Sequence, residues 1–102
     1  MLVVKKFGGT SVADKERIFN VAKRCMKSYQ AGDDVVVVLS AMGKMTDVLI
    51  DQAKDINPNP SKRELDMLLT TGEQTSVALM AMALHSLGVP AISLNAFQVA
   101  MH

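Results

Sequence analysis

Residues 35–39 read VVVVL, an uninterrupted run of aliphatic side chains with no polar residue between them. A strand with one face in water alternates apolar and polar residues, whereas a strand covered on both faces does not need to. The run is therefore typical of an interior strand in a parallel sheet. Parallel neighbours are joined by crossover segments, so helices should connect this strand to the others.

The rest of the chain supplies such helices and two further strands. Apolar residues recur at helical spacing after the first apolar run, and Ser61 with Glu64 forms a capping box before the longest helical pattern. In chain order we expect a strand over residues 2–5, a helix over 14–30, the strand over 35–39, a helix from Gly43 or Thr46 to the loop at 57–60, a helix from about 62 to 87 and a strand over 89–94. This order predicts an α/β fold, a layered sandwich based on a parallel sheet.

The composition excludes several classes of protein. The 102 residues are 49% hydrophobic and 21% charged, which is typical of a folded domain. Eleven basic and ten acidic residues balance too evenly for a protein that binds nucleic acid or a membrane surface. Cys25 is the only cysteine, so no internal disulfide is possible, and the chain has neither a signal-peptide pattern nor an apolar run of membrane-spanning length. We expect a cytoplasmic protein with no nucleic-acid or membrane partner.

The predicted elements leave much apolar surface uncovered. Three strands and three helices form a small core, and residues 95–102, NAFQVAMH, add no closing helix. We interpret the chain as a piece of a larger domain.

Three loops are expected at the carboxyl edge of the sheet, where open α/β sheets bind ligands. They are KFGGTS at residues 6–11, SAMGKMT at 40–46 and LNAFQ at 94–98. The first two combine glycine, lysine and hydroxyl residues, and a helix N-terminus after such a loop adds positive charge, which together suit a phosphate. Neither loop is a Walker A motif, since Met45 follows Gly43 and Lys44. Alone, each glycine pair or lysine is more often a turn or a solvated charge, but two such loops side by side favour an anion site.

The third helix contains a polar stretch, TTGEQTS at residues 70–76, between apolar segments. A glycine inside a helix costs about 1 kcal/mol relative to alanine, so Gly72 needs a reason. One interpretation is that Gly72 lets a neighbouring element pack closely. The other is that it makes room for a ligand whose cationic group meets Glu73.

Three blocks resemble the start of aspartate kinases: VVKKFGGTSV, VVVVLSAMGKMTDVL and LDMLLTTGEQTSVALMAMALHSLGV. The resemblance extends over the whole chain, and KFGGTS is its most specific part. It implies the amino-acid kinase (carbamate kinase-like) fold. It also implies that residues 1–102 are the N-terminal portion of a catalytic domain, without the rest of that domain and the regulatory ACT domains.

The resemblance also implies roles for individual residues. Lys6 would be the catalytic lysine, and ATP would be bound by Lys6, Phe7, Gly8, Gly9 and Thr10. The aspartate substrate would be bound by Ser40, Thr46 and Glu73, with Glu73 on its α-ammonium group. The implied reaction is phosphoryl transfer from Mg-ATP to the β-carboxylate of L-aspartate, the first step of lysine, threonine and methionine biosynthesis. ATP and Mg²⁺ are the implied cofactors, and no residue of this chain is assigned to the metal.

Other functions remain open at this stage. The full-length enzyme is expected to be a homo-oligomer, while the 102-residue chain alone is expected to be inactive. It could act instead as an association module that pairs with itself or with a complementary chain through a sheet edge or apolar helix faces. A kinase for another small carboxylate is the third alternative.

Overall fold

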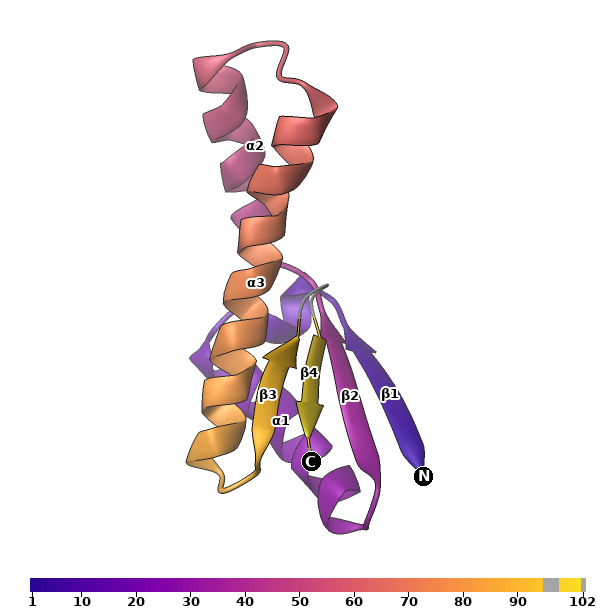
Figure 1. The fold of residues 1–102 in the computed structure, drawn as a ribbon. Helices are drawn as coiled ribbons and strands as arrows, with labels where there is room; N and C mark the ends of the chain where they lie inside the picture. Colours follow the sequence, from indigo (N-terminus) through magenta and orange to yellow (C-terminus); the bar gives the residue numbers. More distant parts are fainter. Residues whose placement is uncertain (95–97, 102) are drawn as a thin grey trace.

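The computed structural model of the chain describes residues 1–94 and 98–101. Its elements are β1 (Leu2–Phe7), the 3₁₀ helix η1 (Gly9–Val12), α1 (Lys15–Gln30), β2 (Asp34–Leu39), α2 (Met45–Ile56), α3 (Lys62–Ser86), β3 (Ala91–Leu94) and β4 (Gln98–Met101), as Figure 1 shows. Each predicted helix and strand is present, with ends within two residues of those expected. The sequence did not predict η1 or β4. Among the described residues, no helix is both long and apolar enough to span a membrane.

The sheet has the strand order β1-β2-β4-β3. β1 and β2 are parallel, with Leu2 opposite Asp34 and Phe7 opposite Leu39. β4 is antiparallel to both β2 and β3, so β3 runs in the same direction as β1 and β2. The α/β class is confirmed, but the sheet is mixed rather than wholly parallel. Only three residues separate β3 from β4, which is too few for the crossover that a parallel partner requires.

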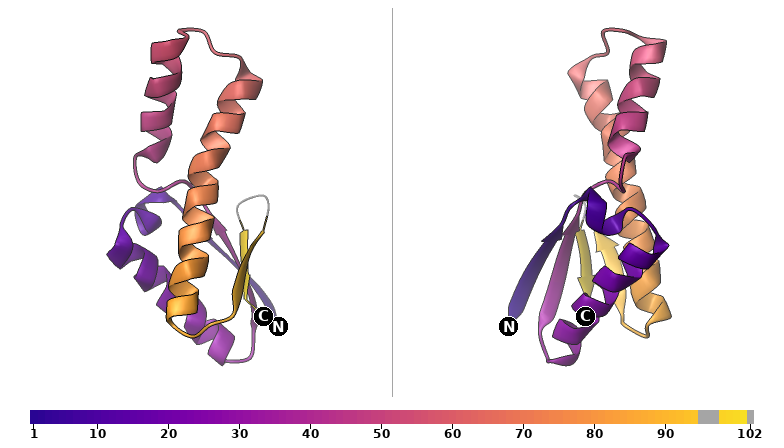
Figure 2. Two further views of the ribbon diagram at one scale, coloured as in Figure 1. Left: turned by 60° about the vertical axis from the view of Figure 1, so that its left-hand side comes forward. Right: turned by 180° about the vertical axis from the view of Figure 1, so that it is seen from behind.

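The helices α1 and α3 cover one face of the sheet, as both views in Figure 2 show. Alternate residues of the two inner strands point into the core between sheet and helices: Val35, Val37 and Leu39 of β2, and Val99 and Met101 of β4. From α3, Met80 and Leu84 are fully buried against them. The run VVVVL is therefore an interior strand, as predicted.

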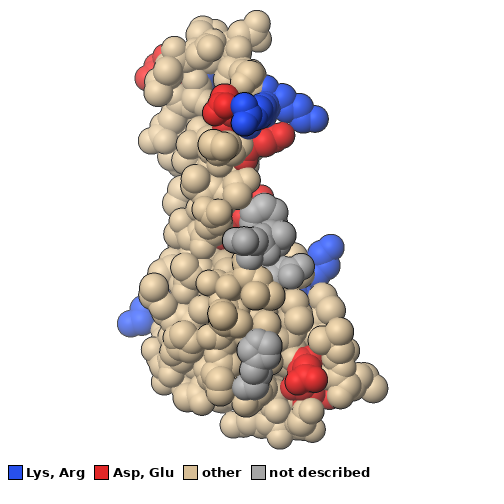
Figure 3. Space-filling model, in the orientation of Figure 1, with Lys and Arg blue, Asp and Glu red and all other residues tan. Residues whose placement is uncertain are grey.

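No helix in the described ranges 1–94 and 98–101 lies over the opposite face of the sheet, and we call it the open face. The strand register places Val4, Val36, Ala100 and Ile92 in one row across all four strands. Val4 is 58% exposed and Ile92 51% exposed. Figure 3 looks onto this side and shows that most of its lower half is uncharged. The expected uncovered apolar surface is thus divided between this face and the two long helices, where Ile56, Met67 and Met82 are also exposed.

The helical hairpin of α2 and α3 projects beyond the sheet and makes the molecule long and narrow, 49 × 24 × 17 Å (Figure 1). α3 begins at the predicted cap, where the Glu64 amide donates to the Ser61 hydroxyl at 3.3 Å. α2 begins at Met45 with Lys44 as an N-cap that supplies no side-chain hydrogen bond. Thr46 therefore lies in the first turn of α2 and does not cap it.

Candidate functional site

The carboxyl ends of β1, β2 and β3 lie at the same edge of the sheet, the upper edge in Figure 1. The loop after β1 and the loop after β2, residues 40–44, meet there. Their backbones are joined by two hydrogen bonds, from the Ser40 amide to the Phe7 carbonyl at 3.3 Å and from the Gly43 amide to the Gly9 carbonyl at 2.9 Å. The two glycine- and lysine-containing loops are therefore neighbours, as predicted.

The two lysines of β1 lie on opposite sides of the sheet. Lys5 is half-buried on the side covered by helices. Burial raises the pKa of the Cys25 thiol to about 11, and the charges of Lys5 and Arg24 reduce that rise. Lys6 is exposed on the open face, and no ion pair holds it within the described part of the chain. Of the two lysines, Lys6 is the one that a ligand can reach from solvent.

The two glycines after β1 have different surroundings. A Cβ atom at Gly8 would have nothing within 4 Å, so the backbone there is open to solvent. A Cβ atom at Gly9 would lie 2.7 Å from the Ala41 carbonyl oxygen and 3.4 Å from the backbone of Gly43. Gly9 therefore allows the two loops to pack together, whereas Gly8 leaves its backbone accessible to a ligand.

Phe7 and Thr10 each have a contact with an arginine of α1. The Phe7 ring packs against the core, and the Arg24 guanidinium carbon lies 5.3 Å from its centroid. The Thr10 carbonyl accepts a hydrogen bond from Arg17 Nη1 at 3.2 Å. Their contribution to ATP binding stays a prediction, as does that of the other residues assigned by resemblance.

The N-terminus of α1 was expected to follow the first loop directly and to add positive charge to an anion site there, and the structure differs from this expectation. η1 intervenes, and the Asp14 carboxylate caps α1 by accepting from the Arg17 amide at 2.8 Å. This carboxylate opposes the positive end of the helix dipole, so α1 adds little attraction for a phosphate. Arg17 is a second cation near the loop besides Lys6, and its side chain donates a hydrogen bond to the loop backbone. The sequence analysis missed Arg17 because its spacing marks it only as an exposed helix residue.

The middle of α3 reaches the same edge. A Cβ atom at Gly72 would meet side-chain atoms of Ala41, Met45 and Leu49 at 3.1 to 3.4 Å. Gly72 therefore makes room for the loop after β2 and for α2, and the interpretation that it makes room for a ligand is wrong. Glu73 follows directly and is half-buried, and burial raises the pKa of its carboxyl group. No ion pair engages Glu73 within residues 1–94 and 98–101.

Ser40 and Thr46 flank this loop. Both are exposed, Ser40 directly after β2 and Thr46 in the first turn of α2. Since Met45 and Ala41 both contact the position of Gly72, the structure brings the segments that carry Ser40, Thr46 and Glu73 together. The third predicted loop contains residues 95–97, which lie outside the described residues.

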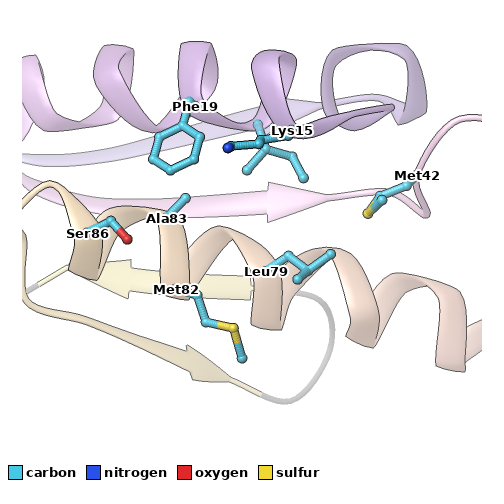
Figure 4. Close-up of a pocket in the computed structure, with 8 residues that line it drawn as sticks. Lys15, Phe19, Met42, Leu79, Met82, Ala83 and Ser86 are labelled. Atoms are coloured by element: carbon cyan, nitrogen blue, oxygen red, sulfur yellow. The ribbon is translucent and has the colours of Figure 1, made fainter.

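A separate hollow of about 300 Å³ lies between α1 and α3 (Figure 4). Its lining is mostly apolar, with Phe19, Met42 and Met82 among the contributors, and Lys15 is the one charged residue among the described residues that line it. None of the predicted site residues lines it. A hollow of this chemistry does not suit a phosphate, so we place the candidate site at the sheet edge instead.

Comparisons with known proteins identify the family of the chain. The model of the amino acid kinase family matches residues 1–101. The chain belongs to this family. It is 59% identical over 97 residues to an aspartokinase of Geobacillus stearothermophilus and 55% identical over 98 residues to an aspartate kinase of Pseudomonas putida. These matches cover 95% and 96% of the chain. The resemblance to aspartate kinases and the amino-acid kinase fold are confirmed.

A solved family member has the same fold. The crystal structure of an aspartate kinase from Synechocystis superposes with a TM-score of 0.90 at 58% identity, over 92% of this chain. The matched part is 16% of that chain, and the present chain spans about a quarter (24%) of the length of the Geobacillus and Pseudomonas relatives. The relatives' names support a kinase, and the reaction of this chain is a matter for proposal.

Proposed function

We propose that the chain forms the phosphate- and aspartate-binding edge of an aspartate kinase. The reaction transfers the γ-phosphoryl group of ATP to the β-carboxylate of L-aspartate and gives 4-phospho-L-aspartate and ADP. In a cell this would be a cytoplasmic step that opens lysine, threonine and methionine biosynthesis. The observation that carries the proposal is the meeting of three segments, after β1, after β2 and in α3, at one sheet edge.

The phosphates would be held by the loop after β1. Lys6 supplies a solvent-facing ammonium, and Gly8 supplies backbone that no side chain shields. Gly9 would act through the packing of the loop, and Thr10 and Phe7 through their positions beside it. A lysine and exposed amides are the groups that phosphoryl-transfer sites use to neutralise developing charge.

The amino acid would be held by residues of the other two segments. Glu73 carries a carboxylate that no described cation neutralises, which suits the α-ammonium group of aspartate. Ser40 and Thr46 present exposed hydroxyl groups on the facing loop and helix. In this arrangement the β-carboxylate lies toward Lys6 and the ammonium group toward α3.

The chemistry needs no general base. A β-carboxylate oxygen of aspartate forms a bond to the γ-phosphorus while the bond from that phosphorus to the β,γ-bridging oxygen breaks, and ADP leaves with that electron pair. The carboxylate is already ionised at neutral pH, so catalysis consists of positioning and charge neutralisation. The described residues contain no cluster of three or more His, Cys, Asp or Glu side chains that could hold a metal ion.

The test is a chimeric enzyme in which this chain replaces the 97 matching residues of the Geobacillus aspartokinase. ADP release that depends on L-aspartate is expected, with glutamate and N-acetylglutamate as competing substrates. Lys6→Ala should lower kcat by about 10²–10³-fold, the loss typical of one electrostatic donor. Lys5→Ala is the matched control and should retain most of the activity. Equal losses in the two variants, or preference for another carboxylate, would contradict the proposal.

The open face favours a second candidate function, self-association of the 102-residue chain. The accessible surface of the whole chain is 6395 Å², whereas a compact protein of this mass has about 5,600 Å². The excess, about 800 Å², is close to what one partner contributes to a standard protein interface. We propose that a second copy of the chain covers the open face when no other part of a kinase does.

Sedimentation velocity tests the second candidate. A dimer should form at micromolar concentrations, and Ile92→Asp should abolish it because a buried unpaired carboxylate is costly. Ile56→Asp is the matched control. Ile56 is 87% exposed at the far end of α2, so this change should leave the dimer intact. A wild-type chain that remains monomeric at high concentration would rule this candidate out.

A further inference from the structure

The loop after β2, residues 40–44, is enclosed by two glycines from distant parts of the chain. On one side, Gly9 comes so close that its Cβ would lie 2.7 Å from the Ala41 carbonyl oxygen. On the other side, a Cβ at Gly72 would lie 3.1 Å from the Ala41 Cβ and 3.2 Å from the Met45 Cγ. Both approaches are closer than a side chain would allow without displacement of a neighbour.

Gly72 is fully inside α3, where glycine is unfavourable by about 1 kcal/mol relative to alanine. It is also buried, so alanine there would gain both helix propensity and apolar burial if space allowed. The space is taken by Ala41, Met45 and Leu49. Close approach of α3 to the loop is therefore the physical reason for a glycine at this position.

The polar residues around Gly72 are satisfied within the helix itself. The hydroxyls of Thr70, Thr71, Thr75 and Ser76 each donate to a carbonyl three or four residues earlier, at 2.6 to 3.4 Å. These groups are therefore engaged with their own helix. Glu73 is the half-buried charged group of this turn, and its place relative to the loop depends on how closely α3 approaches at Gly72.

We infer that Gly72 is a positioning residue of the candidate site: the missing side chain lets α3 lie against Ala41 and Met45, and this contact sets where Glu73 stands relative to the loop after β2. The inference rests on the proposed function for its consequence in substrate binding. Its structural part, the dependence of Glu73 on the contact between Gly72 and Ala41, does not require that the chain be a kinase.

The structural part is tested in the 102-residue chain by NMR titration of the Glu73 carboxyl group. Gly72→Ala forces α3 away from the loop and admits water, so the raised pKa of Glu73 should fall toward its ordinary value. Ala41→Gly removes the nearest carbon that the new methyl group would meet and leaves only the flexible side chains of Met45 and Leu49, so the double variant should restore the raised pKa. Gln74→Ala, an exposed change next to Glu73, is the matched control and should leave the pKa where it is. An unchanged pKa in Gly72→Ala, or no restoration in the double variant, would overturn the inference.

If Gly72→Ala does not fold, Ala41→Ser applies a milder crowding at the same contact, and the same fall in the pKa of Glu73 is expected. The functional part is tested in the chimeric enzyme. There Gly72→Ala should raise the KM for aspartate by about tenfold or more, with the KM for ATP nearly unchanged, and Ala41→Gly should reverse the effect. A chimera without aspartate-dependent activity would refute the proposed function while the titration still decides the positioning role. An active chimera in which the two KM values rise together would refute the positioning role alone.

Discussion

Substitution of the two neighbouring glycines after β1 should separate packing from ligand access. Gly9→Ala places a methyl carbon 2.7 Å from the Ala41 carbonyl oxygen, a backbone atom that can move only if the loop after β2 moves. Overpacking of this kind costs about 1–3 kcal/mol. Displacement of the loop also weakens the hydrogen bond from the Gly43 amide to the Gly9 carbonyl, which contributes about 1 kcal/mol.

Part of this loss is offset in the unfolded chain, because alanine has less backbone freedom than glycine, by about 0.4–1 kcal/mol. The net cost of Gly9→Ala is then about 1–3 kcal/mol. For a chain of 102 residues, an unfolding entropy of about 2 cal/mol/K per residue converts this into a fall in Tm of about 5–15 °C. Gly8→Ala has no neighbour within 4 Å and an extended backbone with φ of −82°, so its Tm should stay the same or rise by a few degrees.

Thermal unfolding followed by circular dichroism gives the two Tm values at equal protein concentration. In the chimeric enzyme Gly8→Ala should weaken ATP binding more than Gly9→Ala does, because the methyl group of Gly8→Ala occupies space that phosphate oxygens need. The KM for ATP should rise by about tenfold in Gly8→Ala. The reasoning is refuted if both variants lose the same stability, or if Gly9→Ala retains the wild-type Tm.

Three further predictions concern single side chains. Burial raises the pKa of Cys25 to about 11, so little of the thiol is ionised at pH 8 in the native chain. The native chain should therefore react with iodoacetamide at pH 8 at least about 100-fold more slowly than the chain unfolded in urea. Equal rates would contradict the burial of the thiol. The raised pKa of Glu73 means that the folded chain binds more protons than the unfolded chain between the ordinary and the raised value. Stability should therefore fall as pH rises through that window, and Glu73→Gln should remove this slope from urea-unfolding curves measured across it. Ser61→Ala removes the cap of α3 and should lower the free energy of unfolding by about 1 kcal/mol, measured by urea unfolding with Lys62→Ala as the control. A loss below about 0.3 kcal/mol, a third of the expected cost, would show that the cap is not formed in solution.

The sequence was sufficient to predict the elements whose signals are local. The run at residues 35–39, the helical spacing of α1 and the capping box before α3 each depend on residues close together in the chain, and the structure has all three. β4 was missed because it is only four residues long and residues 95–97, which precede it, include no glycine or proline. Its insertion between β2 and β3 changes a parallel sheet into a mixed one without altering which strand ends meet at the ligand edge.

The roles of the glycines could not be predicted in the same way. Ala41 lies 32 residues after Gly9 and 31 residues before Gly72, and its contacts with the two glycines exist only after three segments have packed. The face on which each lysine lies was equally hidden, because β1 has apolar residues on both faces and its alternation does not tell covered from open. The residue types thus indicated an anion site. The different roles of Gly8 and Gly9, and of Lys5 and Lys6, could be assigned only from the folded structure.

The open face and the candidate site are linked through Lys6, which lies on that face and pairs in register with Val38 of β2. A second copy that covers the open face would have to cover or pair the Lys6 ammonium, since a buried unpaired charge is strongly unfavourable. A nucleotide bound at Lys6 would then compete with the second copy. By linkage, any ligand that binds the monomer and not the dimer shifts the equilibrium toward monomer. ATP at concentrations well above its Kd should therefore weaken the dimer of the 102-residue chain in sedimentation velocity, and Lys6→Ala should make the dimer insensitive to ATP. If ATP leaves the dimer unchanged, either the interface is not on the open face or the nucleotide does not bind at Lys6. Loss of the dimer in Ile92→Asp would then show that the nucleotide site is wrong, and a dimer that persists in Ile92→Asp would show that the interface is wrong.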